Sequence, residues 1–401
     1  MTTFLLVRHA AHVHQDRLVI GGSRDLPDWV WMSRTGRHFD FETGDPDPEV
    51  GVLDDHAIVF RLAAGGGELH AIRALQPGRQ LQAFTSAGEW VVRGSPVTPT
   101  SAEVELQTRV GSWGPRRIQP VDVDGATLFV GASGRELREF LFAESEQAYQ
   151  AADIALLARH LLDRPADMAF DGRRRLLLIP REDGKAAAVT IDRNSNVVAW
   201  SLLATAGRIV AAATHAGEPW LLVGLGDGVT LLERFGAAPD VDHARTLQSA
   251  GATATWAGLA ELEGREVLAT AEDGRVTRAV VAAGRIMLSG PTRRVTVGTP
   301  FAHEVEPMPV AVPTGRGASP DHPYRPVRTS FRVLETAALR VDVGDGPRPA
   351  LAEGTAALTG DVAVRALGWR RGLALPAWRV AQDDPLPSTI LSATTELKVN
   401  D

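Results

Sequence analysis

A repeated strand-and-turn pattern runs through most of the chain. Segments of roughly 25 to 40 residues each hold an alternating apolar strand, a Gly or Asp turn, a second and more apolar strand, another turn, and a third strand that ends in an aromatic residue. Clear copies occupy residues 71–92, 118–142, 168–191 and 209–235, and weaker copies occupy 13–41 and 255–281. The pattern therefore predicts an all-β chain built from successive β-meanders.

Asp-Gly pairs mark the turns of these copies. They begin at Asp124, Asp171, Asp183, Asp227 and Asp273. Both residue types tolerate the positive φ angles that tight hairpins require, so each pair predicts a short turn between antiparallel strands.

A single meander buries only one face, so several must pack around a common axis. This is the construction of a β-propeller, and residues 1–286 have room for about six blades. A β-sandwich is the structural alternative, but it explains the fixed order of strands within each copy less well.

The chain changes character beyond about residue 286. Thirteen of its 25 prolines lie in residues 287–401, and 310–327 has the composition of a long exposed loop. Strand-like alternation returns at 328–344 and 361–381. We therefore expect residues 287–401 to form a smaller C-terminal β domain, serving as a platform for interactions.

One segment has helical periodicity. In residues 152–163, Asp153 is a suitable N-cap, and Ile154, Leu157 and Leu161 fall on one face of a helix. We expect a linker helix between two blades.

Composition restricts the classes of function. The chain has 401 residues, no cysteine and a net charge of −7, so disulfides and thiolate chemistry are excluded. Residues 1–286 carry a net charge of −8 and residues 287–401 of +1, which disfavours a protein that reads nucleic-acid sequence. Its apolar runs are too short to cross a bilayer, and the N-terminus does not resemble a signal peptide. We expect assembly in a cytoplasm, without membrane insertion.

Histidines near the N-terminus suggest two kinds of chemistry. Val7-Arg8-His9 resembles the start of the histidine phosphatases, with His215 as the second histidine, but that fold needs a parallel α/β sheet. His12 and His14 share a strand face as a metal pair would, yet no third ligand is evident. We therefore predict no catalytic, metal-binding or cofactor-binding residue and no cofactor.

Aromatic and proline-flanked residues give candidates for an interface between subunits. We expect Trp29, Trp31, Trp90, Trp200 and Trp220 to fill the wedges between blades. The C-terminal part holds different candidates, because aromatic side chains are enriched at interfaces. The interface candidates are Trp369, Trp378, Gln382, Asp383, Asp384, Pro385 and Pro387.

Five blocks of sequence resemble one known family. The blocks are HQDRLVIGGSRDLPDWVWMSRTGRHFDF (14–41), QPGRQLQAFTSAGEWVV (76–92), TPTS to REFLF (98–142), YQAADIALLARHLL (149–162) and QDDPLPSTILSATTEL (382–397). In this order they resemble the tail nozzle or hub proteins of short-tailed bacteriophages and related prophages, also described as tail tubular or DNA-stabilisation proteins. The resemblance spans nearly the whole chain.

The resemblance implies a structural role in the virion tail. It implies a β-propeller with an attached platform, assembled as a homohexamer that conducts DNA out of the capsid without sequence-specific binding. The implied partners are the tail adaptor or portal-neck proteins and the tail fibre or spike proteins. On this basis we expect no enzymatic activity. Two alternatives are a propeller-type enzyme that acts on host surface glycans, which needs two carboxylates facing one pocket, and a receptor-binding propeller without chemistry.

Overall fold

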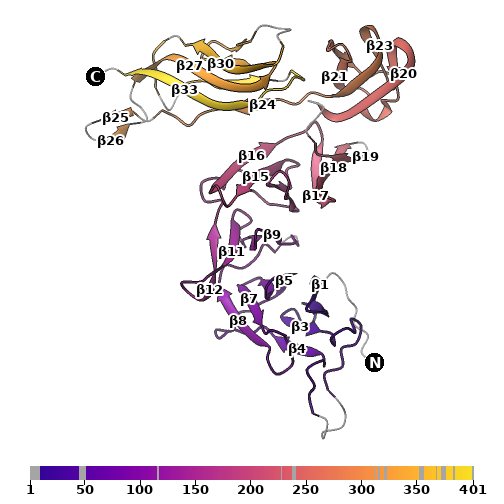
Figure 1. Ribbon diagram of the computed structural model, residues 1–401, viewed down its shortest axis with the longest axis vertical. Coiled ribbons are helices and arrows are strands. Elements are labelled where there is room, and N and C mark those ends of the chain that lie inside the picture. The colour runs from indigo at the N-terminus through magenta and orange to yellow at the C-terminus, as the bar shows by residue number, and fades with distance from the viewer. Residues whose placement is uncertain are drawn as a thin grey trace. The chain divides into compact units, whose positions relative to one another are not determined.

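The structure, a computed structural model, is built almost entirely from β-strands (Figure 1). It describes residues 10–44, 51–114, 117–226, 228–236, 241–310, 312–314, 317–319, 323–351, 356–366, 368–371, 376–382 and 384–399. In this part of the chain the one helical element is the 3-10 turn η1 (Ala260–Leu262), so the predicted all-β class is confirmed. None of its helices is long and apolar enough to span a membrane.

Two compact units divide the chain at Phe235 and Gly236. The first unit holds five antiparallel sheets whose strands follow one another in chain order. The first sheet contains β1 (Ala10–His14), β2 (Arg17–Gly21), β3 (Trp29–Met32) and β4 (Ile58–Arg61), and the second contains β5 (Ile72–Gln76), β6 (Leu81–Thr85), β7 (Glu89–Arg93) and β8 (Glu103–Thr108).

The remaining sheets of the first unit repeat this order. The third contains β9 (Val121–Val123), β10 (Ala126–Val130), β11 (Leu137–Ala143) and β12 (Ala148–Asp153). The fourth contains β13 (Ala169–Asp171), β14 (Leu176–Pro180), β15 (Ala186–Asp192) and β16 (Val197–Leu203), and the fifth contains β17 (Arg208–His215), β18 (Glu218–Gly226) and β19 (Val229–Arg234). These sheets are meanders, as predicted, and their strand order is compatible with the blades of a propeller.

Burial within the sheets also matches blades that are packed on both faces. Every residue of β6 and β10 is buried, whereas the fourth strand β16 is mostly exposed. Neighbouring sheets contact each other in chain order, through β1 with β5, β8 with β12, β9 with β13, and β13 with β17. The inner strands therefore form the core, and the last strand of a blade lies at its outer edge.

The Asp-Gly turns differ in which residue adopts a positive φ angle. Asp124 and Gly125 both have positive φ, as the turn between β9 and β10 requires. Asp171 is instead fully buried, and its Oδ1 accepts hydrogen bonds from the backbone N–H groups of Arg173 and Arg174. In that hairpin, Arg175 takes the positive φ angle. Asp227 lies outside the described residues.

The predicted helix at 152–163 is wrong. Asp153 ends β12, and the residues after it form successive turns. Its Oδ1 does accept a hydrogen bond from the backbone N–H of Ala155, as a cap would. However, Leu157 is 94% exposed, while Ala155 and Leu162 are buried. The side chains that the helical pattern would bury are too few to stabilise a helix at this position.

The second unit begins with a sheet in which the chain order is broken. Its strands are β20 (Asp242–Ala257), β21 (Glu266–Ala271), β22 (Val276–Val280) and β23 (Arg285–Thr299), in the order β20-β23-β21-β22. The copy predicted at 255–281 lies in this sheet. The boundary predicted after residue 286 falls inside β23, because that strand pairs backwards with β20 and β21 and so belongs to the same unit.

The rest of the second unit has two further sheets that enclose one core. One contains β24 (His303–Val305), β32 (Arg379–Gln382), β28 (Arg340–Asp342) and β29 (Pro347–Pro349). The other contains β30 (Leu358–Arg365), β27 (Pro323–Thr336), β31 (Arg370–Arg371) and β33 (Ile390–Val399), and a short hairpin joins β25 (Val312–Thr314) to β26 (Gly317–Ser319). Tyr324, Phe331 and Val380 are among the buried side chains between the two sheets. These two sheets lie within the range 287–401 for which a C-terminal β domain was predicted.

Candidate functional site

The junction between the second and third sheets is held by aromatic side chains. Phe84 of β6 packs on Phe129 and Phe140 of the third sheet, with ring centroids 4.8 and 5.6 Å apart. Phe140 in turn stacks on Tyr149 at 4.6 Å. All four rings are buried, so this cluster joins the two blades through apolar contact.

Backbone segments interlock at the same junction. The turn after β6 and the segment after β8 are joined by a 2.7 Å hydrogen bond from the N–H of Ser112 to the carbonyl oxygen of Thr85. Gly111 has φ +74°, and a Cβ at this position would lie 2.5 Å from the carbonyl oxygen of Ser86. Glycine is therefore required where the connector crosses the turn.

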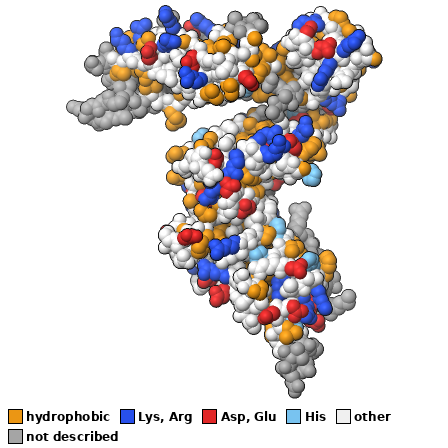
Figure 2. Space-filling view, viewed as in Figure 1, with side chains coloured by type: hydrophobic (Ala, Val, Ile, Leu, Met, Phe, Trp, Pro, Cys, Tyr) orange, Lys and Arg blue, Asp and Glu red, His pale blue; other side chains and the backbone are white. Residues whose placement is uncertain are grey.

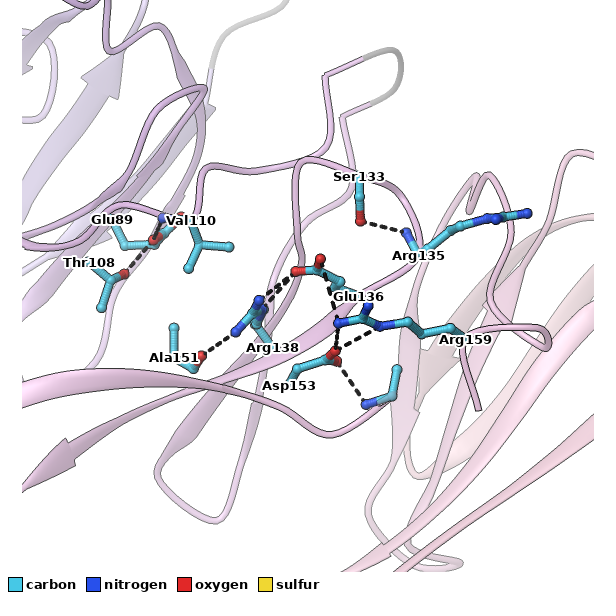
Figure 3. Close-up of polar contacts among 11 residues, drawn as sticks. Glu89, Thr108, Val110, Ser133, Arg135, Glu136, Arg138, Ala151, Asp153 and Arg159 are labelled. Atoms are coloured by element: carbon cyan, nitrogen blue, oxygen red, sulfur yellow. Dashed lines mark hydrogen bonds and ion pairs between the residues drawn. The ribbon is translucent and has the colours of Figure 1, made fainter. Parts of the chain in front are cut away.

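Glu89 is a fully buried carboxyl group beside this crossing. Its Oε2 accepts hydrogen bonds from the hydroxyl of Thr108 and, at 3.4 Å, from the N–H of Val110 (Figure 3). Its Oε1 is buried without a partner among the described residues. Burial raises the pKa of Glu89 to about 7, although its hydrogen bonds and the charge of Arg138 act in the opposite direction.

Two arginines and two carboxylates form a network within the third sheet (Figure 3). Arg138 donates to Glu136 at 2.9 and 2.7 Å and to the carbonyl oxygen of Ala151 at 2.9 Å. Arg159 donates to Asp153 at 3.1 and 2.7 Å, and its Nη2 lies 3.8 Å from Glu136. The network fixes the turn segment after β12 against the loop before β11.

A small hollow lies beside the aromatic cluster. Its lining includes Arg73, Ser112 and Trp113, which each have a buried polar atom without a protein partner among the described residues. The ring of Trp113 covers Gly134, where a Cβ would come within 2.6 Å of it. The hollow has room for about one water molecule, which would bridge these polar groups.

The contacts described here serve to fix one sheet on the next. The charged groups of the third sheet are paired with each other, and Glu89 is closed off from solvent. Sequence reasoning missed Glu89, Arg138 and Arg159. A signal was present for all three, because Glu89, Arg138 and Arg159 fall within the blocks 76–92, 98–142 and 149–162.

The predicted interface residues occupy different environments. Trp369 is 50% exposed, as an interface would need. Trp378 is only 8% exposed, packs edge-on against Phe331 at 5.0 Å, and donates its indole N–H to Thr395 at 3.1 Å. Trp378 is therefore a core side chain, buried in the same cluster as Phe331 and Val380.

The other interface candidates lie at or after the end of β32. Gln382 is 3% exposed, with both side-chain polar atoms buried and without a partner among the described residues. Asp384 forms an ion pair with Arg340 at 3.2 Å, and Pro385 is buried while Pro387 is exposed. Asp383 lies outside the described residues. Trp369 and Pro387 are thus the candidates available on the surface.

The N-terminal histidines form part of the first sheet. His9 lies outside the described residues, whereas His12 and His14 belong to β1, the expected first strand. His14 is buried, which lowers its pKa, and His215 ends β17 at an exposed position. No cluster of metal-binding side chains occurs among the residues that the structure describes.

No protein-family model and no curated protein matches the sequence. Solved structures align over nearly all of it at low similarity. An exo-β-1,3-galactanase from Phanerochaete chrysosporium has 7% identity, a TM-score of 0.30, and coverage of 97% of this chain and 95% of that one. The extracellular domain of a hybrid two-component system protein from B. thetaiotaomicron has 8% identity, a TM-score of 0.28, and coverage of 96% and 54%. A glycoside hydrolase has 10% identity, a TM-score of 0.24, and coverage of 97% and 96%.

These comparisons contradict the expectation that the protein is not an enzyme. Carbohydrate-cleaving enzymes are among the structures that align over the full chain, so the exclusion of an enzyme is withdrawn. With TM-scores of 0.24 to 0.31, the alignments place no catalytic residue and no substrate in this chain.

Proposed function

We propose that the protein is a structural subunit of a phage tail and forms a hexameric nozzle or hub ring through which DNA leaves the capsid. The observation that carries the proposal is the ordered series of five sequence blocks that resemble the tail nozzle family. The location in the virion tail and the partners, which are adaptor or portal-neck proteins and fibre or spike proteins, belong to the same proposal.

The structure gives these blocks a physical role that suits a conduit. The blocks 76–92, 98–142 and 149–162 supply the aromatic cluster and the interlocked turns between the second and third sheets, and the paired charges within the third sheet. A wall that resists internal pressure needs stiff, close-packed junctions of this kind. The block 382–397 supplies most of β33, the last strand of the C-terminal sheet.

Assembly of the purified full-length protein tests the proposal. We expect a closed ring of about six copies in light scattering and in electron micrographs, formed alone or with the adaptor protein of the same particle. Trp369→Ala should lower the ring fraction because Trp369 is a large exposed aromatic side chain in the C-terminal unit. Leu157→Ala, which alters an exposed side chain of the first unit, is the matched control.

A monomer that persists with the adaptor protein present would contradict the ring.

The second candidate is a propeller-type enzyme or receptor-binding protein that acts on host surface glycans. Such an enzyme needs two carboxylates that face one pocket, and the carboxyl group of Glu89 is not one of them because it is closed off from solvent. A screen of the protein against β-1,3-galactan and bacterial surface glycans separates the candidates. Sugar release would favour the enzyme, and glycan binding without release would favour the receptor-binding protein.

A further inference from the structure

The C-terminal sheet formed by β30, β27 and β33 has two unlike faces. Tyr324, Phe331 and Val333 of β27 point into the core, whereas Arg328 and Arg332 are exposed. Figure 2 shows Lys and Arg side chains gathered over this part of the second unit. The solvent face is therefore charged, and the strand register shows how the charges are arranged.

Like charges lie opposite each other across this face. Arg328 of β27 pairs in register with Arg365 of β30, and Arg325 of β27 pairs with Lys398 of β33. Like charges at directly opposed positions destabilise a sheet. Among the residues that the structure describes, no ion pair involves any of these four side chains. We name these four residues the basic face.

The surroundings of the basic face leave most of its charge uncompensated. Glu396 of β33, opposite Arg328, is the acidic residue in the same row. The Nε of Arg325 is buried and has no hydrogen-bond partner among the described residues. Further along β27, the charge of Arg332 is neutralised, because this side chain donates to both carboxylate oxygens of Asp361 at 2.8 and 2.9 Å. The basic face thus lacks a counterion that the neighbouring row has.

We propose that the basic face binds the phosphate backbone of duplex DNA. Cations fixed on adjacent strands, about 4.8 Å apart, offer a rigid row to successive phosphates, and their like-charge repulsion is relieved when phosphates lie between them. The whole chain is acidic, with a net charge of −7, so a row of cations without ion-pair partners is the surface that DNA would favour. Side chains that touch only phosphates carry no sequence information, so binding is independent of base sequence.

This inference rests on the proposed function, because it names the surface of the ring that meets the DNA. A few cations per copy give weak binding to DNA. A ring of about six copies raises the overall affinity, while each single contact still dissociates easily. Weak, evenly repeated contacts would guide a duplex through the ring and still let it slide.

The test measures binding of the full chain to a labelled duplex by fluorescence anisotropy, between about 50 and 200 mM salt. The double variant Arg328→Gln/Arg365→Gln should reduce affinity about tenfold or more at the low-salt end and make the salt slope shallower by about 2. Arg332→Gln is the matched control, since Asp361 already neutralises that arginine on the same strand. Two duplexes of unrelated sequence should bind equally.

Several results would overturn the proposal. Equal binding by the wild type and the double variant would do so, as would an equal loss in Arg332→Gln. Binding to vesicles of phosphatidylglycerol that depends on Arg328 and Arg365, without binding to DNA, would replace DNA by a lipid surface. Thermal unfolding of the double variant checks that it is folded, and we expect it to be at least as stable as the wild type because the repulsion between Arg328 and Arg365 is removed.

Measuring the oligomeric state in the same samples separates this inference from the proposed function. A ring that forms but does not bind DNA removes the basic face as a contact and leaves the nozzle in place. DNA binding that depends on the basic face, in a protein that never forms a ring, removes the nozzle and leaves the contact.

Discussion

The sheets of the first unit and the C-terminal sheet of the second unit share antiparallel pairing but differ in how their faces are buried. In the first unit the inner strands are buried on both faces, as every residue of β6 and β10 is. In the C-terminal sheet, β27 alternates between a buried side and a charged, exposed side. When sheets pack in series, both faces of their inner strands are buried against neighbours. A sheet with one solvent-exposed face has a surface on which a partner can bind.

Electrostatics differ in the same way between the two regions. At the junction of the first unit, Arg138 and Arg159 are satisfied by Glu136 and Asp153. On the C-terminal sheet, Arg328 and Arg365 face each other without such partners among the described contacts. Paired charges within a fold stabilise its geometry, and unpaired charges on a rigid face indicate binding.

The largest expected effect comes from removing a ring of the aromatic cluster. Phe140→Ala should destabilise the first unit by about 3–5 kcal/mol, because it deletes contacts with Phe84 and Tyr149 and leaves a cavity. Phe331→Ala should have a similar effect on the second unit. In calorimetry, each variant should lower a different transition; a shift of both transitions by either variant would break the comparison between the units.

The next effect is a pH dependence that centres on Glu89. Its folded-state pKa of about 7 lies above the ordinary value of 4.5, so the protonated group stabilises the fold fully below pH 4.5 and this stabilisation is lost as the pH rises through about 7. The difference amounts to about 3 kcal/mol. Glu89→Gln should flatten the curve of unfolding free energy between these pH values, as followed by urea denaturation. An unchanged curve would show that Glu89 does not carry the dependence.

Loss of the carboxylate of Asp153 should cost less, about 1–3 kcal/mol. Asp153→Ala removes the acceptor of Arg159 and of the N–H of Ala155. Leu157→Ser is the control, because Leu157 is 94% exposed on the same segment, and it should change stability by less than about 0.5 kcal/mol. Similar losses in both variants, measured by chemical denaturation, would show that the segment is held by apolar contact and not by the ion pair.

The smallest effect has the opposite sign. Arg365→Thr removes one of two like charges at opposed positions, so we expect the second unit to gain about 0.2–1 kcal/mol. Thermal unfolding at low salt measures the gain, which should shrink at high salt because screening weakens the repulsion. A loss of stability would mean that Arg365 has a stabilising role in the isolated chain.

Sequence patterns predicted where strands and turns lie better than they predicted which side chains are buried and which strands pair. Alternation and Asp-Gly turns located most strands of the first unit. The helix at 152–163 failed because its periodicity arose by chance in a turn segment, where Leu157 points to solvent. The predicted boundary after residue 286 falls inside β23, a strand whose pairing with β20 and β21 no local pattern records.

The candidate sites were predicted less well, for a similar reason. Trp378 was expected at a surface, but its burial depends on two sheets that close over it. The basic face was not visible in the sequence, because Arg328, Arg365 and Lys398 lie in three separate strands and only the register brings them together.

The register of β33 determines when the basic face is complete during folding. Each sheet of the first unit is complete once a short continuous stretch of chain has been made, as in a protein that folds in sequence from its N-terminus. By contrast, Tyr324 of β27 pairs with Val399 of β33, and the whole of β30 lies between them in the chain. The strands of the basic face therefore come together by closure of a long loop, and we expect this step to be slower than the formation of a meander in the first unit.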